Sequence, residues 1–444
     1  MAMVVKTNKD ALTTLNNLNR NSNALSKSLS KVSTGMKINS AKDDASGYAI
    51  SERMRVQIRS LDQANQNTQN GNSMMKTAEG AVSSTIEILK SLKDKAINAA
   101  NDTNNTETDR ATIQKEMDQF IDQIDDNANV TYNGKYMLDG TKNFKTECGT
   151  KSTYINMSLS TTTTASTGLT SLSNRAGSSL EIASTDTISI SFVNGGKTYS
   201  TAFIVSTNAN VESLSSMATA AKNDVGSTFE FASNAVVATT AGTSRGSVTQ
   251  LPSDGQSAVV IEAKSAGVQQ QISGLTIRIT DQEGNVRKSA TEAINNFNEV
   301  IHAEDSSSDN ALTFHVGAKA NNSIKVGLQD MRAEALGLRG SDGTKLNIST
   351  QEKAEAAISV LDSAISRALD QQTTIGAVQA RLEYTSSNLT TASENVQASE
   401  STIRDADMAK EMTEYTKNNV LLQAAQSMLA QANQNSSAVL SLLQ

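Results

Sequence analysis

Residues 421–444 limit the possible folds of this chain more than any other segment. They include no Asp, Glu, Lys or Arg, although Gln, Asn and Ser recur among them. Such a segment is too polar to span a membrane and too apolar to remain a solvated tail. Its apolar residues recur at alternating steps of four and three, which predicts a helix with one face that needs a partner. The residues of this face are Leu421, Ala425, Met428, Ala432, Val439 and Leu442.

A second apolar stripe with the same spacing lies at the opposite end of the sequence. Its residues include Leu15, Leu18, Leu25, Leu29 and Val32. An isolated helix of this kind is marginally stable, because helical stability in proteins comes mainly from packing. We therefore expect the two terminal helices to pair and to become ordered when copies of the chain assemble. A contact between copies that does not close into a ring would produce a helical filament.

The composition favours long helices over a compact enzyme core. Of 444 residues, 3% are aromatic, Trp is absent, and there are one Pro, one Cys and two His. The net charge of −7 is modest and both signs are mixed along the chain, so a nucleic-acid partner is excluded. The N-terminus does not resemble a signal peptide and no apolar run is long enough to cross a membrane. We expect a soluble protein whose export does not use the usual leader.

Helical periodicity also fills much of the remaining sequence. Heptad spacing predicts a helix of about fifty residues from Ile50, which would be roughly 75 Å long. An acidic first turn near Glu107 predicts a second helix with one apolar face, antiparallel to the first. Ser349 and Glu352 form a possible capping box for a last helix, and no proline interrupts the sequence from there to Gln444.

Residues from about 140 to 320 have a different character, with a low-complexity Ser/Thr-rich run at 158–173. Alternating apolar residues predict strands at 187–193, 199–205, 258–263 and 275–280, a turn at Asn194-Gly195, and a β-hairpin at 312–328. A short helix is expected at 211–222. The predicted fold class is mainly α, with long antiparallel coiled-coil helices from both termini and a β-rich (α+β) inserted outer domain.

Several segments at both ends resemble bacterial flagellin, the subunit of the flagellar filament. At the N-terminal end they are NNLN (16–19), STGMKINSAKDDASG (33–47) and ISERMR (50–55); at the C-terminal end they are GAVQARLE (376–383), IRDADMAKEM (403–412) and MLAQANQ (428–434). The resemblance implies an inner coiled-coil domain of residues 1–40 and 404–444. It also implies a helical filament-core domain with a β-hairpin, residues 41–140 and 311–403, and a variable outer domain, residues 141–310.

The resemblance further implies a secreted structural protein that polymerises with itself into the extracellular flagellar filament for motility. The family is exported unfolded through a type III apparatus, and its other partners are an export chaperone, the filament cap and the hook-associated junction proteins. No cofactor is implied. Carried over to this chain, the chaperone-binding residues are Met412, Leu421, Leu422, Met428, Leu429, Val439 and Leu442. The alternatives are a hook-filament junction protein and a secreted adhesin displayed through the insert.

The resemblance also extends to the residues that the innate immune receptor for flagellin recognises in the family. These are an Arg, then Glu-Leu, on the first long helix and a Glu on the next. The aligned residues here are Ser91, Asp94, Lys95 and Glu116. Loss of the Arg removes a planar set of donors, and Lys95 places a charge where an apolar residue packs in the family. We therefore expect weak activation of this receptor.

Enzymatic sites have little support in the sequence. His302, Glu304 and His315 do not have the spacing of a zinc protease helix, so neither a catalytic nor a metal site is expected. The acidic pair Asp43-Asp44 is interpreted as a helix start rather than as a metal site. Cys148 has no intramolecular partner. The run 158–173 is a hypothetical site of O-glycosylation.

Overall fold

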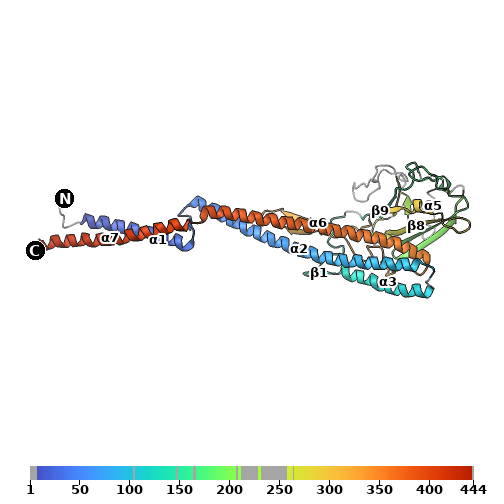
Figure 1. Ribbon diagram of the computed structural model, residues 1–444, viewed down its shortest axis with the longest axis horizontal. Coiled ribbons are helices and arrows are strands. Elements are labelled where there is room, and N and C mark those ends of the chain that lie inside the picture. Colours follow the sequence, from blue (N-terminus) through green and yellow to red (C-terminus); the bar gives the residue numbers. More distant parts are fainter. Residues whose placement is uncertain are drawn as a thin grey trace. The chain divides into compact units, whose positions relative to one another are not determined.

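The computed structural model describes residues 8–103, 106–146, 149–163, 167–206, 209–211, 229–231, 258–263 and 265–442, without side chains at 229–231 and 436–442. The major helices are α1 (Lys9–Thr34), α2 (Ala45–Ala100), α3 (Glu107–Ala128), α6 (Gln351–Arg404) and α7 (Met408–Leu442) (Figure 1). The predicted fold class, mainly α with a β-rich insert, is confirmed. Residues 212–222 of the helix expected at 211–222, and Cys148, lie outside the described residues.

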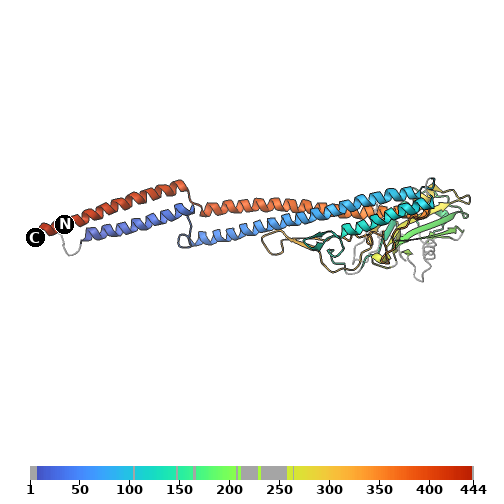
Figure 2. The same ribbon diagram turned by 90° about the horizontal axis from the view of Figure 1, so that it is seen from below.

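Internal contacts divide the chain into two compact units. The first contains residues 1–68, 315–322 and 384–444, and the second contains residues 69–314 and 323–383. In the first unit α1 and α7 lie side by side and antiparallel (Figure 2). The adjoining parts of α2 and α6 pack through Leu61, Ala64 and Leu389.

Short capping contacts determine where the helices of the first unit begin and end. The Asn8 side chain accepts a hydrogen bond from the Ala11 amide at the start of α1, and Gly35 ends that helix with a φ of 70°. Such a left-handed residue closes a helix most readily when it is glycine. At the start of α2, the Asp44 carboxylate accepts from the Ser46 and Gly47 amides, as the helix-start interpretation expects.

The sequence expectation of an uninterrupted C-terminal helix is wrong. α6 ends at Arg404 and α7 begins at Met408. Between them, the Ala406 amide donates to the Gly35 carbonyl, and the Lys37 amide donates to the Arg404 carbonyl. These hydrogen bonds between distant segments of the same chain use backbone groups that a continuous helix would pair within itself. The helix therefore breaks without a proline.

The second unit contains a helical core and a β-rich part. The buried core residues of its α2 portion and of α3 include Met75, Leu89, Leu92, Met117, Ile121 and Ile124. α3 begins with a capping box of Thr106 and Asp109. The capping box expected at Ser349 and Glu352 is wrong by one residue, because the Thr350 hydroxyl accepts from the Lys353 amide and α6 begins at Gln351.

Two antiparallel sheets form most of the β-rich part. The three-stranded sheet has the order β5 (Lys197–Ile204), β4 (Thr187–Asn194), β8 (Ile272–Thr280), and the four-stranded sheet has the order β6 (Phe229–Phe231), β7 (Val259–Ala263), β3 (Thr153–Asn156), β9 (Phe297–Ile301). A hydrophobic core joins residues of both sheets with α5 (Lys288–Asn295), including Tyr154, Phe192, Ile277, Val259 and Ile294. Two hairpins complete the described strands, β1 (Thr131–Tyr132) with β2 (Lys135–Tyr136) and β10 (Leu312–His315) with β11 (Ser323–Val326). Strands β4, β5, β7 and β8 and the β10–β11 hairpin agree with the sequence predictions.

Candidate assembly surface

The contact between α1 and α7 consists of small, polar and medium-sized apolar side chains. On α1 the residues turned away from solvent recur at steps of three and four, and Ser28 is buried. They are Ala11, Thr14, Leu18, Asn21, Leu25, Ser28 and Val32. On α7 the half-buried residues have the same spacing and are Tyr415, Asn418, Leu422, Ala425, Leu429 and Ala432. We call this contact the α1–α7 seam.

Polar contacts fix the register of this seam. The Asn418 side-chain amide donates to the Ser28 hydroxyl at 3.2 Å, and the Asn21 amide donates to the Leu421 carbonyl at 3.3 Å. The Lys31 ammonium lies 3.5 Å from the Glu411 carboxylate. Polar residues in a coiled-coil seam specify one alignment at a cost in stability. The pair is therefore well specified in register but weakly held.

Several large apolar side chains of the two helices lie outside the seam. Leu12, Leu15 and Leu29 of α1 are 56%, 41% and 52% exposed. Met412, Val420, Leu421 and Met428 of α7 are 46%, 58%, 42% and 62% exposed. We call these seven residues the exposed apolar set. Single exposed apolar residues are common, but a group this large indicates a surface that a partner covers.

The residues of the two predicted stripes divide between the α1–α7 seam and the exposed apolar set. Leu18, Leu25, Val32, Ala425 and Ala432 lie in the seam, whereas Leu15, Leu29, Leu421 and Met428 belong to the exposed apolar set. Consecutive residues differ by about 100° around a helix, so a seam through Leu422 and Leu429 turns Leu421 and Met428 outward. The side chains of Val439 and Leu442 lie outside the described residues.

The residues expected to bind a chaperone are divided between two faces of α7. Met412, Leu421 and Met428 belong to the exposed apolar set, while Leu422 and Leu429 lie in the seam with α1. A chaperone that held all five would have to replace α1.

The aligned receptor residues lie on α2 and α3 in the second unit. The Lys95 ammonium is 2.7 Å from the Glu116 carboxylate. The Ser91 hydroxyl donates to the Glu87 carbonyl of its own helix, and Asp94 is exposed. The one carboxylate that the family pattern retains is therefore already paired within the chain.

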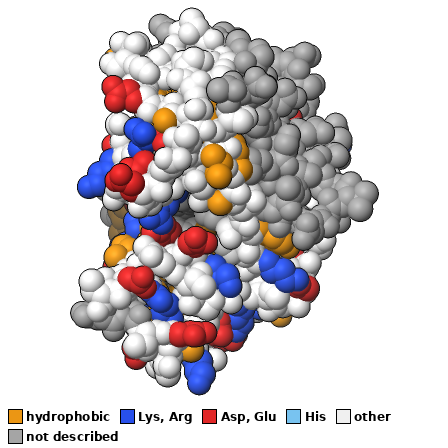
Figure 3. Space-filling view, turned by 90° about the vertical axis from the view of Figure 1, so that its right-hand side faces the viewer, with side chains coloured by type: hydrophobic (Ala, Val, Ile, Leu, Met, Phe, Trp, Pro, Cys, Tyr) orange, Lys and Arg blue, Asp and Glu red, His pale blue; other side chains and the backbone are white. Residues whose placement is uncertain are grey.

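Neither a cluster of metal ligands nor a membrane span is found among the described residues. Among the described side chains, no group of three or more His, Cys, Asp or Glu is positioned to hold a metal ion. Within those same residues, no helix has the length and hydropathy that a membrane span requires. His302 lies in the loop that follows β9, and its Nδ1 accepts a hydrogen bond from the Arg367 guanidinium at 2.9 Å. On the face shown in Figure 3, both signs of charge are interspersed among the described side chains.

Long paired terminal helices with an exposed apolar set define a fibrous subunit that assembles with copies of itself. Residues 5–143 match the bacterial flagellin N-terminal helical region, and residues 358–443 match the C-terminal helical region. A flagellin of Clostridium tyrobutyricum is 36% identical over 97% of this chain and 99% of its own length. A flagellin of Bacillus subtilis is 29% identical over 99% of this chain and all of its own length.

The chain belongs to the bacterial flagellin family. It is a structural subunit of the flagellar filament, an extracellular appendage that serves motility. Among solved structures, a flagellar junction protein of Legionella pneumophila aligns with 80% of this chain and 99% of its own, at 14% identity and a TM-score of 0.32.

Proposed function

We propose that the exposed apolar set of α1 and α7 is the surface that neighbouring subunits bury in the filament. The observation that supports this is that these apolar side chains lie outside the α1–α7 seam and are between 41% and 62% exposed. Full burial of one Leu or Met side chain contributes about 1.5–3 kcal/mol. Burial of these seven residues by neighbouring subunits would add a driving force beyond that of the α1–α7 seam.

Seeded polymerisation followed by electron microscopy tests this proposal. Replacement of Leu421 and Met428 by Asn is expected to raise the critical monomer concentration at least tenfold. The matched control replaces Gln423 and Gln426, which are also exposed on α7, by Ala. Polymerisation of the Leu421/Met428 variant at the native concentration would refute the proposal. A chain that ends at Asn419 is expected to form no filaments at all.

The two groups of residues on α7, those in the α1–α7 seam and those in the exposed apolar set, also bear on the order of events before assembly. We propose that the chain is exported unfolded by the flagellar type III apparatus and that an export chaperone first covers α7. The chaperone would contact both the exposed apolar set and Leu422 and Leu429, so that α1 pairs with α7 only after release. Exclusion of α1 would prevent early polymerisation. Cross-linking between positions 28 and 418 should then be suppressed when the chaperone is bound.

In the filament we propose three functional parts. Residues 1–40 and 404–444 form the inner coiled-coil domain, residues 41–140 and 311–403 the surrounding helical domain, and residues 141–310 the outer domain. The terminal parts would also contact the cap and the hook-associated junction proteins. Limited proteolysis of filaments tests this division, because cleavage is expected first within 141–310.

We further propose that this subunit activates the innate flagellin receptor weakly. The support is the Lys95–Glu116 ion pair, since a receptor that used Glu116 would have to break it. A reporter-cell response as strong as that to an enteric flagellin would refute this proposal.

A further inference from the structure

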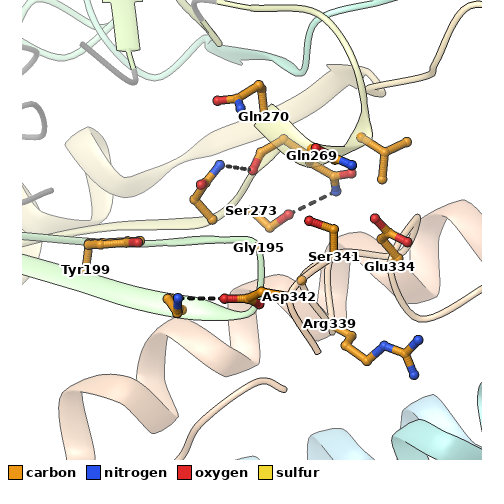
Figure 4. A pocket seen from close by; sticks show the side chains of 15 residues that line it. Gly195, Tyr199, Gln269, Gln270, Ser273, Glu334, Arg339, Ser341 and Asp342 are labelled. Carbon is orange, nitrogen blue, oxygen red and sulfur yellow. Dashed lines mark hydrogen bonds and ion pairs between the residues drawn. The ribbon is translucent and has the colours of Figure 1, made fainter. Parts of the chain in front are cut away.

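A cleft of about 220 Å³ lies in the second unit between the β4–β5 turn, the segment before β8, and residues 334–342 (Figure 4). Gln269 and Gln270 lie on one side of it, Glu334 and Ser341 on another, and Tyr199 across from them. It is smaller than the ~300–1,000 Å³ pockets that hold drug-sized ligands. Its size therefore suits one small ring.

The floor of the cleft is held rigidly by close backbone approach. A Cβ atom on Gly340 would overlap the Gly195 carbonyl oxygen, and one on Gly196 would overlap the Thr344 carbonyl oxygen. The Thr344 hydroxyl donates to the Gly195 carbonyl at 3.0 Å. These contacts fix the β4–β5 turn against the loop. The backbone of the site is therefore already formed, and a ligand would have to order only the side chains that contact it.

A buried polar network forms the inner wall. Gln271 is 4% exposed, and its side-chain amide donates to the Ser273 hydroxyl at 2.9 Å. The Asn194 side-chain amide donates to the Gln271 carbonyl at 2.9 Å. This network sets the position of the adjoining Gln269 and Gln270. Their side chains are exposed and form no hydrogen bond or ion pair to any described residue.

The charged groups around the cleft are mostly neutralised by one another. The Lys197 ammonium lies 2.7 Å from the Asp342 carboxylate, and the hydrogen bond from Lys197 holds the pKa of Asp342 well below its usual range. The Arg339 guanidinium lies 2.6 Å from the Asp125 carboxylate. Among the described lining residues, no cation is left for a phosphate or sulfate group. Amides, hydroxyls and the single carboxylate of Glu334 remain.

We propose that this cleft binds one ring of an uncharged saccharide. Primary amides carry two donors and one acceptor oxygen, which matches the paired donor and acceptor character of neighbouring sugar hydroxyls. Gln269 and Gln270 contact the hydroxyls from one side, and Ser341 and Glu334 contact them from the other. The Tyr199 ring, which also lines the cleft, stacks on Phe192 with centroids 5.5 Å apart, and its apolar surface contacts the carbon atoms of the sugar.

Saturation-transfer NMR on the full-length monomer tests the proposal. The probes are methyl glycosides of glucose, galactose, mannose and N-acetylglucosamine, with sialic acid and a sulfated galactose as anionic arms. A separate arm presents glycoproteins with and without enzymatic removal of their terminal sugars, which distinguishes a free sugar from a glycan terminus. We expect at least one neutral glycoside to bind. Failure of all neutral probes at 20 mM, or preference for an anionic one, would overturn the proposal.

The variant Gln269→Ala/Gln270→Ala locates the site. Both residues are exposed, so the fold should not change, and the affinity for the neutral glycoside should fall at least tenfold. Gln282→Ala, in the exposed turn after β8, is the matched control and should bind as the native chain does. Equal binding by the double variant and the control would refute the assignment of the cleft. Because binding is measured on monomers, the result does not depend on polymerisation.

Discussion

The Arg367 guanidinium of α6 lies 2.6 Å from the Glu299 carboxylate of β9, and both side chains are almost fully buried. Arg367 also donates to the carbonyl of Ala335 and to Nδ1 of His302. A single buried cation thus joins the long helix to the four-stranded sheet and to the loop before α6. These three segments are far apart in the sequence.

Replacement of Arg367 by Met should destabilise the second unit by about 3–5 kcal/mol, because Glu299 would remain buried without its partner. Urea unfolding followed by tyrosine near-UV circular dichroism measures the loss. The double variant Arg367→Met/Glu299→Gln should recover most of it. Equal losses in both variants would show that the pairing itself contributes little.

The same pair predicts a dependence of stability on pH. Burial raises the pKa of Glu299, but the charge of the Arg367 guanidinium outweighs burial and holds this pKa below its ordinary value of 4.5. A lowered folded-state pKa stabilises the fold above the unfolded value, and this contribution is lost as the pH falls through the folded-state pKa. The free energy of unfolding should therefore decrease below about pH 4.5. The Glu299→Gln variant should show a smaller decrease over the same range.

Asn418→Leu should make the α1–α7 pair more helical but less specific. The substitution removes the hydrogen bond to Ser28 and replaces a polar seam position by an apolar one, which stabilises coiled coils while relaxing their register. Far-UV circular dichroism of the monomer should show more helix, and electron microscopy should show irregular filaments. Normal filaments with unchanged helicity would contradict this expectation. Asn433→Leu, on the exposed side of α7, is the control.

Lys95→Leu combined with Ser91→Arg should increase the receptor response. The first change releases Glu116 from its ion pair at 2.7 Å and restores an apolar side chain, and the second restores a planar set of donors. We expect the half-maximal concentration in a reporter-cell assay to fall at least tenfold. Lys93→Leu removes the neighbouring Lys93–Asp362 ion pair and should leave the response unchanged.

Gly196→Ala should weaken the β4–β5 turn. Gly196 has a φ of 76°, and an added Cβ would meet the Thr344 carbonyl oxygen. A non-glycine residue in such a conformation costs about 1–3 kcal/mol before the overlap is counted. Thermal unfolding should occur at a lower temperature than in Gly284→Ala, where φ is also positive but the space is open. Equal midpoints would show that the close approach is easily relieved.

Elements set by local pattern could be predicted from the sequence. The buried residues of α2, among them Ala78, Val82 and Leu89, follow the heptad spacing, and the Asn194-Gly195 signal marks the β4–β5 turn. Strands β3 and β9 and helix α5 were not predicted. β3 and β9 are short and pair with each other across about 140 intervening residues, so their stability comes from long-range partners rather than from their own sequence.

The sequence indicated that the terminal helices carry a contact surface, but not which face of each helix forms it. Apolar spacing could not separate Leu421 from Leu422, because these two leucines are adjacent. The structure separates them through Asn418 and Ser28, whose hydrogen bond fixes the rotation of α7. The Lys95–Glu116 and Arg367–Glu299 pairs had no local signal at all, since each depends on how distant segments pack.

The break between α6 and α7 has a mechanical consequence. The two strands of backbone that cross this joint, at 35–37 and 404–406, are hydrogen-bonded to each other in the manner of a short antiparallel ribbon. A single flexible strand could swivel freely about its own bonds, but two bonded strands must twist together. The two bonds should therefore restrict rotation about the joint more than a single strand would. In a rotating filament, the joint would act as a coupling that transmits torque between the paired terminal helices and the helices that follow.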